Sequence, residues 1–133
     1  EMLRSLVGSE MCKETDDELG HFCGDKVLAQ VASKLSSQFR TSDIIGRIGG
    51  DEFAVFLFNI PDHEFARKKG VEIVQSMQGV KTDREHSIVL SCSVGISLAP
   101  AQGICFDELY RKADKALYTA KDQGKNCSCI YSD

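Results

Sequence analysis

Apolar residues recur along the chain with two periods, one typical of helices and one typical of strands. The helical runs are residues 24–39, 62–78 and 106–122. The β-rich runs are residues 44–48, 53–60, 87–99 and 127–131. Residues 2–7 fit either a strand or the end of a helix. Pro61-Asp62 ends one strand and Gly124 ends the last helix, so the predicted elements have clear boundaries there.

The runs 44–48 and 53–60 are separated only by the turn "GGDE", which predicts a β-hairpin. The predicted order is β-α-β-β-α-β-α-β. Helices alternate with strands, but the central pair of strands is a hairpin. The pattern therefore predicts an α/β (α+β) sandwich with a mixed, mainly antiparallel central sheet, ferredoxin-like at its centre.

Length and composition indicate one domain over residues 1–133, because there is no repeat, low-complexity tract or linker. The net charge of −4 argues against binding a nucleic-acid polymer, which usually needs a basic surface. There is no apolar run of about 20 residues and no signal peptide pattern. None of the six cysteines forms a Cys-x-x-Cys pair. We therefore expect reduced thiols and a cytoplasmic protein.

The hairpin turn has two interpretations. Gly49 and Gly50 suit a tight turn because glycine reaches positive φ at little cost, and the acids after them are then a solvated tip. In the other interpretation, backbone N–H groups of the turn approach phosphates while a carboxylate holds Mg²⁺. The turn alone does not decide between them.

The wider sequence resembles the GGDEF family, the bacterial diguanylate cyclases. "IGGDEFAVFL" resembles the family's signature turn, and "CKETDDELGHFCGD", residues 12–25, is similar to its Phe-Lys-x-Ile-Asn-Asp-x-x-Gly-His-x-x-Gly-Asp segment. "LSCSVGISLA" resembles its Thr-Val-Ser-x-Gly-x-Ala strand, and "RKADKALYTAKDQGKN", residues 111–126, resembles its last helix and the turn that follows. The matches occur in the family's order and extend from about Gly8 to Tyr131.

The resemblance implies that two domains, each holding one GTP, meet head to head and join the two GTP into cyclic di-GMP with release of two pyrophosphates. It implies Mg²⁺ or Mn²⁺ as cofactor and a fold like the palm of nucleotidyl cyclases and polymerases. The implied partners are GTP, cyclic di-GMP, a second copy of the domain and an upstream sensory domain. The family's helical segment before the first strand is absent, so we expect a truncated piece of a longer protein that meets a membrane only through segments outside this sequence.

The resemblance also implies roles for particular residues. Asp51 and Glu52 would be catalytic, and the metal contacts would be Asp51, Glu52 and Ser9. The substrate-binding residues would be Asp16, His21, Asp25, Gly49, Gly50, Lys121 and Lys125. Each has a plainer interpretation. Asp25 suits a helix N-cap, the lysines suit a solvated helix end, and His21 suits ordinary packing.

Five residues separate the end of Arg40-Thr41-Ser42-Asp43 from Gly49. At this offset the Arg-x-x-Asp pattern resembles the family's inhibitory site for cyclic di-GMP. An arginine fork pairs with phosphate or guanine, and a carboxylate accepts guanine N–H groups. Away from that context the same pattern indicates a surface ion pair.

Three positions depart from the family pattern. Gly8 stands where the family has the first Asp of Asp-Ile-Asp, so one expected metal carboxylate is missing; Glu10 is two residues further on. Asp16 replaces an Asn, which loses a hydrogen-bond donor, and Cys12 replaces a Phe. Besides the cyclase, these departures leave open a degenerate domain that binds cyclic di-GMP or GTP as a regulator, and an interaction domain that binds no nucleotide.

Overall fold

The structure is a computed structural model that describes residues 3–14, 28–49, 52–78 and 89–132. Its strands are β1 (Leu3–Glu14), β2 (Ile44–Gly49), β3 (Glu52–Ile60), β4 (Val89–Ala99) and β5 (Ser128–Ile130). Its labelled helices are α2 (His63–Met77) and α3 (Phe106–Asp122), and residues 28–36 are also helical.

The strands form one sheet in the order β2-β3-β1-β4-β5. Strand β1 lies at the centre and pairs antiparallel with both β3 and β4. Strands β2 and β3 pair antiparallel as the predicted hairpin, and β5 pairs parallel with β4. The sheet is therefore mixed and mainly antiparallel, which confirms the predicted fold class.

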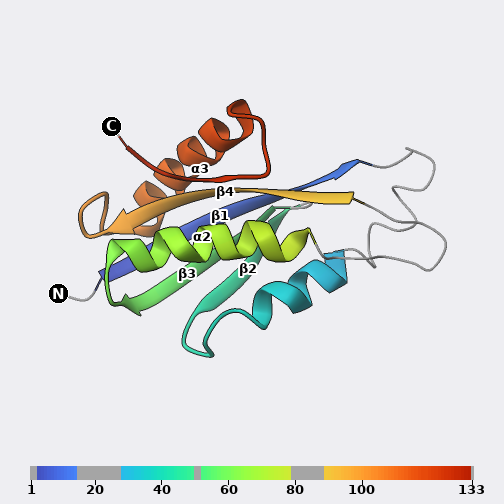
Figure 1. Cartoon of the computed structure of the whole chain (residues 1–133). Helices are drawn as coiled ribbons and strands as arrows, with labels where there is room; N and C mark the ends of the chain where they lie inside the picture. The colour runs from blue at the N-terminus through green and yellow to red at the C-terminus, as the bar shows by residue number, and fades with distance from the viewer. Residues whose placement is uncertain (1–2, 15–27, 50–51, 79–88, 133) are drawn as a thin grey trace.

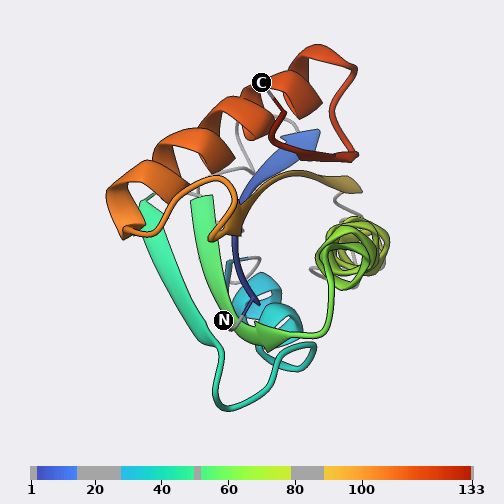
Figure 2. The ribbon, with the colours of Figure 1, turned by 90° about the vertical axis from the view of Figure 1, so that its left-hand side faces the viewer.

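Helices cover both faces of the sheet. Figure 2 shows α3 across one face of the curved sheet, with α2 and the helix of residues 28–36 on the other. Figure 1 shows α2 lying along the strands, so the molecule has three layers. Because side chains alternate along a strand, each strand supplies residues to both faces.

Each face has its own core. On the α2 face, Val55 and Leu57 of β3 pack with Val31 and Leu35 of the helical residues 28–36 and with Ile73 of α2. On the α3 face, a smaller cluster contains Leu6, Ala54, Ala99, Leu109 and Ala113, with Phe56 and Tyr110 packed against it. Burial of this kind stabilises a domain by about 25 cal/mol per Å² of apolar surface, so both helical layers are held mainly by apolar contact.

Local signals explain where the helices begin and end. Asp62 caps α2, because its carboxylate accepts the N–H of Phe65 at 2.8 Å. Helix α3 ends with the N–H of Lys125 donating to Ala120 at 3.1 Å, and Gly124 adopts a φ of 114°. These are the boundaries that the sequence predicted. The first strand is longer than residues 2–7, since β1 continues to Glu14.

Among the helices within the described ranges, none combines the length and apolar character needed to cross a bilayer.

Candidate functional site

A row of polar residues crosses three neighbouring strands at the end of the sheet where the hairpin turns. Glu52, the first residue of β3, is the register partner of Glu10 in β1, and Glu10 is in turn the partner of Ser93 in β4. We call these three positions the polar row. Like charges directly opposite each other destabilise a sheet. A bound cation would offset repulsion between like charges, so a row with two acidic residues in register is a position where a cation can be sought.

The polar row also contains a polar atom without a partner. The hydroxyl of Ser93 is fully buried and, in the described part of the chain, has no hydrogen-bond partner. Most buried polar atoms in folded proteins are hydrogen-bonded. The two described side chains of the row, Glu52 and Ser93, carry hard oxygen donors, which is the chemistry that Mg²⁺ prefers. The donor set fits such an ion, although the described residues contain no group of three or more acidic, cysteine or histidine side chains around one point.

The position expected to supply another carboxylate has room for a Cβ atom. Gly8 is the register partner of Ala54 in β3 and of Gly95 in β4, two residues before the polar row. A Cβ atom at Gly8 would meet only the Gly95 carbonyl oxygen, at 3.9 Å. Close packing of neighbouring atoms therefore does not require a glycine at position 8. At Gly95, by contrast, a Cβ would lie 2.2 Å from the Ala113 carbonyl oxygen, because α3 packs directly on the β4 backbone.

A residue of α3, Tyr110, holds the Glu52 side chain by a hydrogen bond. The Tyr110 hydroxyl donates to the Glu52 Oε1 atom at 3.0 Å. The ring of Tyr110 stacks on Phe106, with 5.8 Å between centroids and 24° between planes. Burial, followed by the hydrogen bond to Glu52, raises the pKa of Tyr110 above its usual value of 10.0. The phenol is therefore protonated, and a hydrogen-bond donor, throughout the neutral range.

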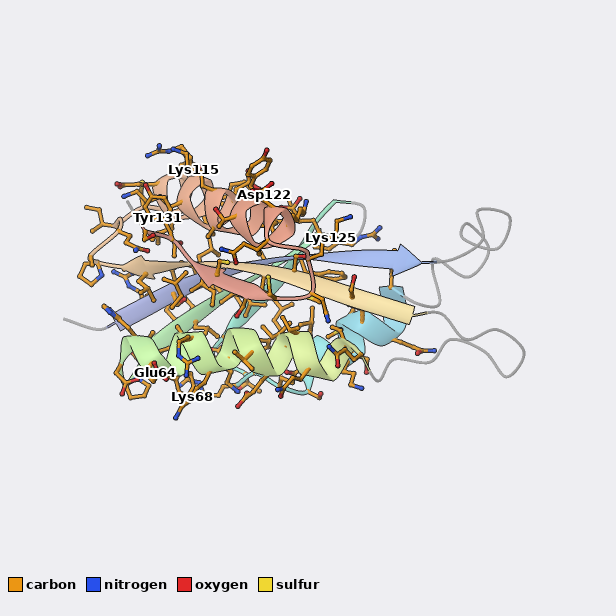
Figure 3. All side chains as sticks on the ribbon, turned by 45° about the horizontal axis from the view of Figure 1, so that its top comes forward. Glu64, Lys68, Lys115, Asp122, Lys125 and Tyr131 are labelled. Atoms are coloured by element: carbon orange, nitrogen blue, oxygen red, sulfur yellow. The ribbon has the colours of Figure 1, made fainter. Side chains whose placement is uncertain are left out.

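The end of α3 carries the two predicted phosphate-binding lysines. Lys121 lies in the last turn of the helix, and Lys125 follows it in the left-handed region with a φ of 62°. A non-glycine residue in that region costs about 1–3 kcal/mol and is often found at functional sites. Figure 3 shows Lys125 past the end of α3, on the opposite side of the sheet from Glu64 and Lys68 of α2.

Contacts along α3 show which end of the sheet these lysines are near. The Ser97 hydroxyl of β4 donates to the Leu109 carbonyl at 2.7 Å, and Gly95 is in contact with Ala113 and Leu117. Moving from Ser97 to Gly95 along β4 thus moves from the first turn of α3 toward its last. Continuing in this direction, Ser93 of the polar row and the Lys121 end of α3 lie on the same side of Gly95.

The other face of the sheet has a hollow beside the same turn. Its volume is about 500 Å³, a size typical of small-ligand sites. Its walls are mostly apolar and come from the helical residues 28–36 and from both hairpin strands. The lining residues are Leu28, Ala29, Ala32, Ser36, Ile45, Gly46, Arg47 and Phe53. Arg47 and Phe53 are register partners near the turn, so the hollow is next to the end of the hairpin.

The predicted inhibitory pair is in contact. Arg40 Nη2 lies 3.2 Å from Asp43 Oδ1, and the Arg40 side chain is 50% exposed whereas that of Asp43 is 3% exposed. The Asp43 carboxylate also accepts the backbone N–H groups of Arg40, at 3.0 Å, and of Phe58, at 3.4 Å. Asp43 thus ties the turn before β2 to strand β3. Arg40 is the member of the pair that faces solvent.

Several predicted site residues lie outside the described ranges. These are Asp16, His21, Asp25, Gly50 and Asp51. Ser9 lies in β1 as the register partner of Phe53 and Val94. Gly49 ends β2 and is the register partner of Glu52, so these two turn residues are adjacent across the hairpin. The roles of all these residues stay predictions.

Sequence reasoning missed the hollow and the Tyr110 contact. The hollow is lined by three separate segments, and of its lining residues only Phe53 and the adjacent hairpin positions lie by the signature turn. Tyr110 lies 58 residues from Glu52 and sits at a helical position where an aromatic residue suggests core packing. The available signal was weak. A Tyr on the buried side of a helix usually needs a polar partner for its hydroxyl.

Comparison with known proteins identifies a family and several relatives that this chain resembles. The family model "Diguanylate cyclase, GGDEF domain" matches residues 6–127. The chain is 36% identical over 121 residues to the diguanylate cyclase TpbB of Pseudomonas aeruginosa, an alignment that covers 90% of this chain and 28% of TpbB. It is 35% identical over 120 residues to the cyclic di-GMP phosphodiesterase NbdA of the same species, covering 90% of this chain and 15% of NbdA. The chain thus spans less than a third of either relative.

A solved structure agrees with the sequence matches. The crystal structure of the GGDEF domain of PA1120 (YfiN or TpbB) from Pseudomonas aeruginosa superposes with a TM-score of 0.92 at 30% identity, covering 99% of this chain and 84% of that one. The similarity therefore extends across both helical layers and the whole sheet.

Proposed function

The chain belongs to the GGDEF family of diguanylate cyclase domains, and from that premise we propose that it is one half of a catalytic centre that joins two GTP into cyclic di-GMP. In this proposal each copy of the domain holds one GTP, and two copies bring the nucleotides face to face. The polar row across β3, β1 and β4 is the observation that carries the proposal, because it places carboxylate positions and a buried hydroxyl beside the signature turn.

The hollow on the α2 face is proposed to take the guanine base. Its apolar walls suit a flat aromatic ring, and its position beside Arg47 and Phe53 puts a base there within a nucleotide's length of the turn. Asp25, three residues before Leu28, is proposed to accept the guanine N–H groups. The hollow and the polar row lie on opposite faces, so the ribose and phosphates pass around the hairpin end.

The triphosphate is proposed to lie between the turn and the end of α3. Gly49 and Gly50 let the main chain approach the phosphates, and Lys121 and Lys125 neutralise their charge. The left-handed conformation of Lys125 supports this role, because a strained residue at a helix end is typical of a site that is fixed for ligand contact.

The acidic residues are proposed to activate the attacking hydroxyl. Asp51 accepts the proton of the 3′-hydroxyl of one GTP as that oxygen bonds to the α-phosphorus of the other, and the bond to the bridging oxygen breaks to release pyrophosphate. Asp51, Glu52 and a β1 oxygen at Ser9 are the residues proposed to hold Mg²⁺ or Mn²⁺. A bound divalent cation supplies charge neutralisation on the phosphates and lowers the pKa of a coordinated hydroxyl.

The decisive experiment incubates purified protein, fused to a dimerising segment, with GTP and Mg²⁺ and measures cyclic di-GMP by chromatography. We expect product from the wild-type chain and a loss of at least a hundredfold in Asp51→Ala, since activation of the hydroxyl is lost. A folded dimer that makes no product would overturn the cyclase proposal.

A second candidate function is a receptor that binds cyclic di-GMP without making it. Gly8 favours it, because that strand position offers no carboxylate although a Cβ atom there would meet no close contact. Arg40, half exposed and anchored on Asp43, is its proposed ligand contact. In the same assay this candidate predicts no product, together with calorimetric binding of cyclic di-GMP that Arg40→Ala abolishes.

A further inference from the structure

Tyr110 connects α3 to Glu52, the acidic residue of the signature turn that the structure describes. Its hydroxyl reaches the Glu52 Oε1 atom at 3.0 Å, over a sequence separation of 58 residues. Glu52 is the first residue of β3, next to the turn and in the polar row. The contact therefore links the last helix directly to a residue proposed to bind the cation.

The phenol is itself held in place. Its ring stacks on Phe106 and packs against the α3-face cluster that contains Leu6, Ala54 and Leu109. A tyrosine has only two side-chain torsions, and packing on a helix restricts both. A glutamate at the start of a strand has three and samples several orientations in the absence of a partner. Tyr110 therefore provides a fixed point for a side chain that is otherwise flexible.

The chemistry of the donor matters as much as its position. A carboxylate has two oxygens with about four lone-pair sites, and the phenol occupies one of them. The phenol is a neutral donor, so its hydrogen bond brings no positive charge to the Glu52 carboxylate. Glu64 on α2 shows the opposite arrangement, since the Arg67 guanidinium spans both of its oxygens at 2.8 and 2.9 Å and neutralises it. A neutral donor orients a carboxylate without competing with a metal for its charge.

We propose that Tyr110 is a positioning residue that orients the Glu52 carboxylate toward a divalent cation at the end of the polar row. The inference rests on the metal-binding role of Glu52 in the proposed function. Groups that hydrogen-bond a metal ligand typically contribute 10- to 100-fold to metal affinity. Tyr110 acts through Glu52, so its effect must vanish when Glu52 loses its charge.

The test measures Mn²⁺ binding to the whole chain by electron paramagnetic resonance, without nucleotide. Tyr110→Phe removes the hydroxyl and keeps the ring, its stacking on Phe106 and its apolar packing. We expect its dissociation constant for Mn²⁺ to rise at least tenfold. Tyr118→Phe is the matched control, because Tyr118 is on the same helix but 73% exposed, and we expect a change of less than twofold. Circular dichroism checks that both variants fold.

A double-mutant cycle separates positioning from a general structural effect. In a Glu52→Gln background, Tyr110→Phe should change Mn²⁺ affinity by less than twofold. An unchanged affinity in Tyr110→Phe alone, an equal loss in both backgrounds, or no measurable Mn²⁺ binding by the wild-type chain would each overturn the inference. The cycle involves no turnover, so a chain that binds Mn²⁺ as expected but makes no cyclic di-GMP refutes the cyclase proposal and leaves the positioning role standing.

Discussion

At position 8 a glycine stands in a strand where a Cβ atom would meet no close contact. The nearest atom to a Cβ there is 3.9 Å away, and the position is two residues from the polar row. Gly8→Asp would add a hard oxygen ligand on the central strand. We predict that it lowers the Mg²⁺ concentration for half-maximal cyclase activity by about tenfold, measured as the initial rate of product formation across a Mg²⁺ titration.

Gly8→Asn is the control for that titration, since it adds nearly the same volume without the charge. A shift of the Mg²⁺ midpoint in both variants, or in neither, would show that the charge at position 8 does not contribute to cation binding.

The Arg40–Asp43 pair has one buried and one exposed member, so the two substitutions should differ. Asp43→Ala leaves the N–H groups of Arg40 and Phe58 without their acceptor, and we expect a loss of about 1–3 kcal/mol in the free energy of unfolding. Arg40→Ala keeps both N–H groups bonded to Asp43, so it should lower the free energy of unfolding by less than Asp43→Ala does. Arg40→Ala should also weaken cyclic di-GMP binding at least tenfold.

Denaturant unfolding and titration calorimetry measure the two effects separately. Equal destabilisation by both substitutions, with cyclic di-GMP binding intact in Arg40→Ala, would mean that the pair is purely structural.

Among the secondary-structure elements, α3 determines how the site is assembled. It packs so closely on β4 that a Cβ at Gly95 would lie 2.2 Å from the Ala113 carbonyl oxygen and 2.3 Å from the Leu117 nitrogen. Gly95→Ala must push the helix off the sheet, and we predict a loss of about 1–3 kcal/mol or more in the free energy of unfolding. The displaced helix should also weaken the Tyr110–Glu52 contact.

Gly8→Ala is the matched control for chemical denaturation, because it adds the same methyl group on the adjacent strand, where a Cβ would make only an ordinary contact at 3.9 Å. Equal midpoints for the two alanine variants would contradict the close packing of α3 on β4.

The elements themselves were largely predictable from the sequence, and their contacts were not. Asp62 and Gly124 mark helix ends through local hydrogen bonds and backbone conformation, so the boundaries of α2 and α3 follow from nearby residues. Strand β1 was underestimated because residues 8–14 lack the apolar alternation of a half-buried strand; its pairing with both β3 and β4 extends it. The hollow and the Tyr110 contact depend on residues that only the fold brings together.

On the scale of the whole molecule, the proposed site lies at one end of the sheet and uses both faces. The base is assigned to the hollow under the helical residues 28–36, and the phosphates to the end of α3. A cyclic product needs two new phosphodiester bonds. In the proposal each domain activates one attacking hydroxyl, so a single domain supplies half of the reaction.

The most direct test is therefore the product made by a tandem chain of two copies in which one copy carries Asp51→Ala. The account predicts cyclic di-GMP and two pyrophosphates per product from the unmodified tandem. With one Asp51 removed, it predicts that the linear dinucleotide accumulates, since only one bond is formed efficiently. Unchanged formation of cyclic di-GMP by the singly substituted tandem, or no product from either chain, would contradict the claim that each domain contributes one half of the catalytic centre.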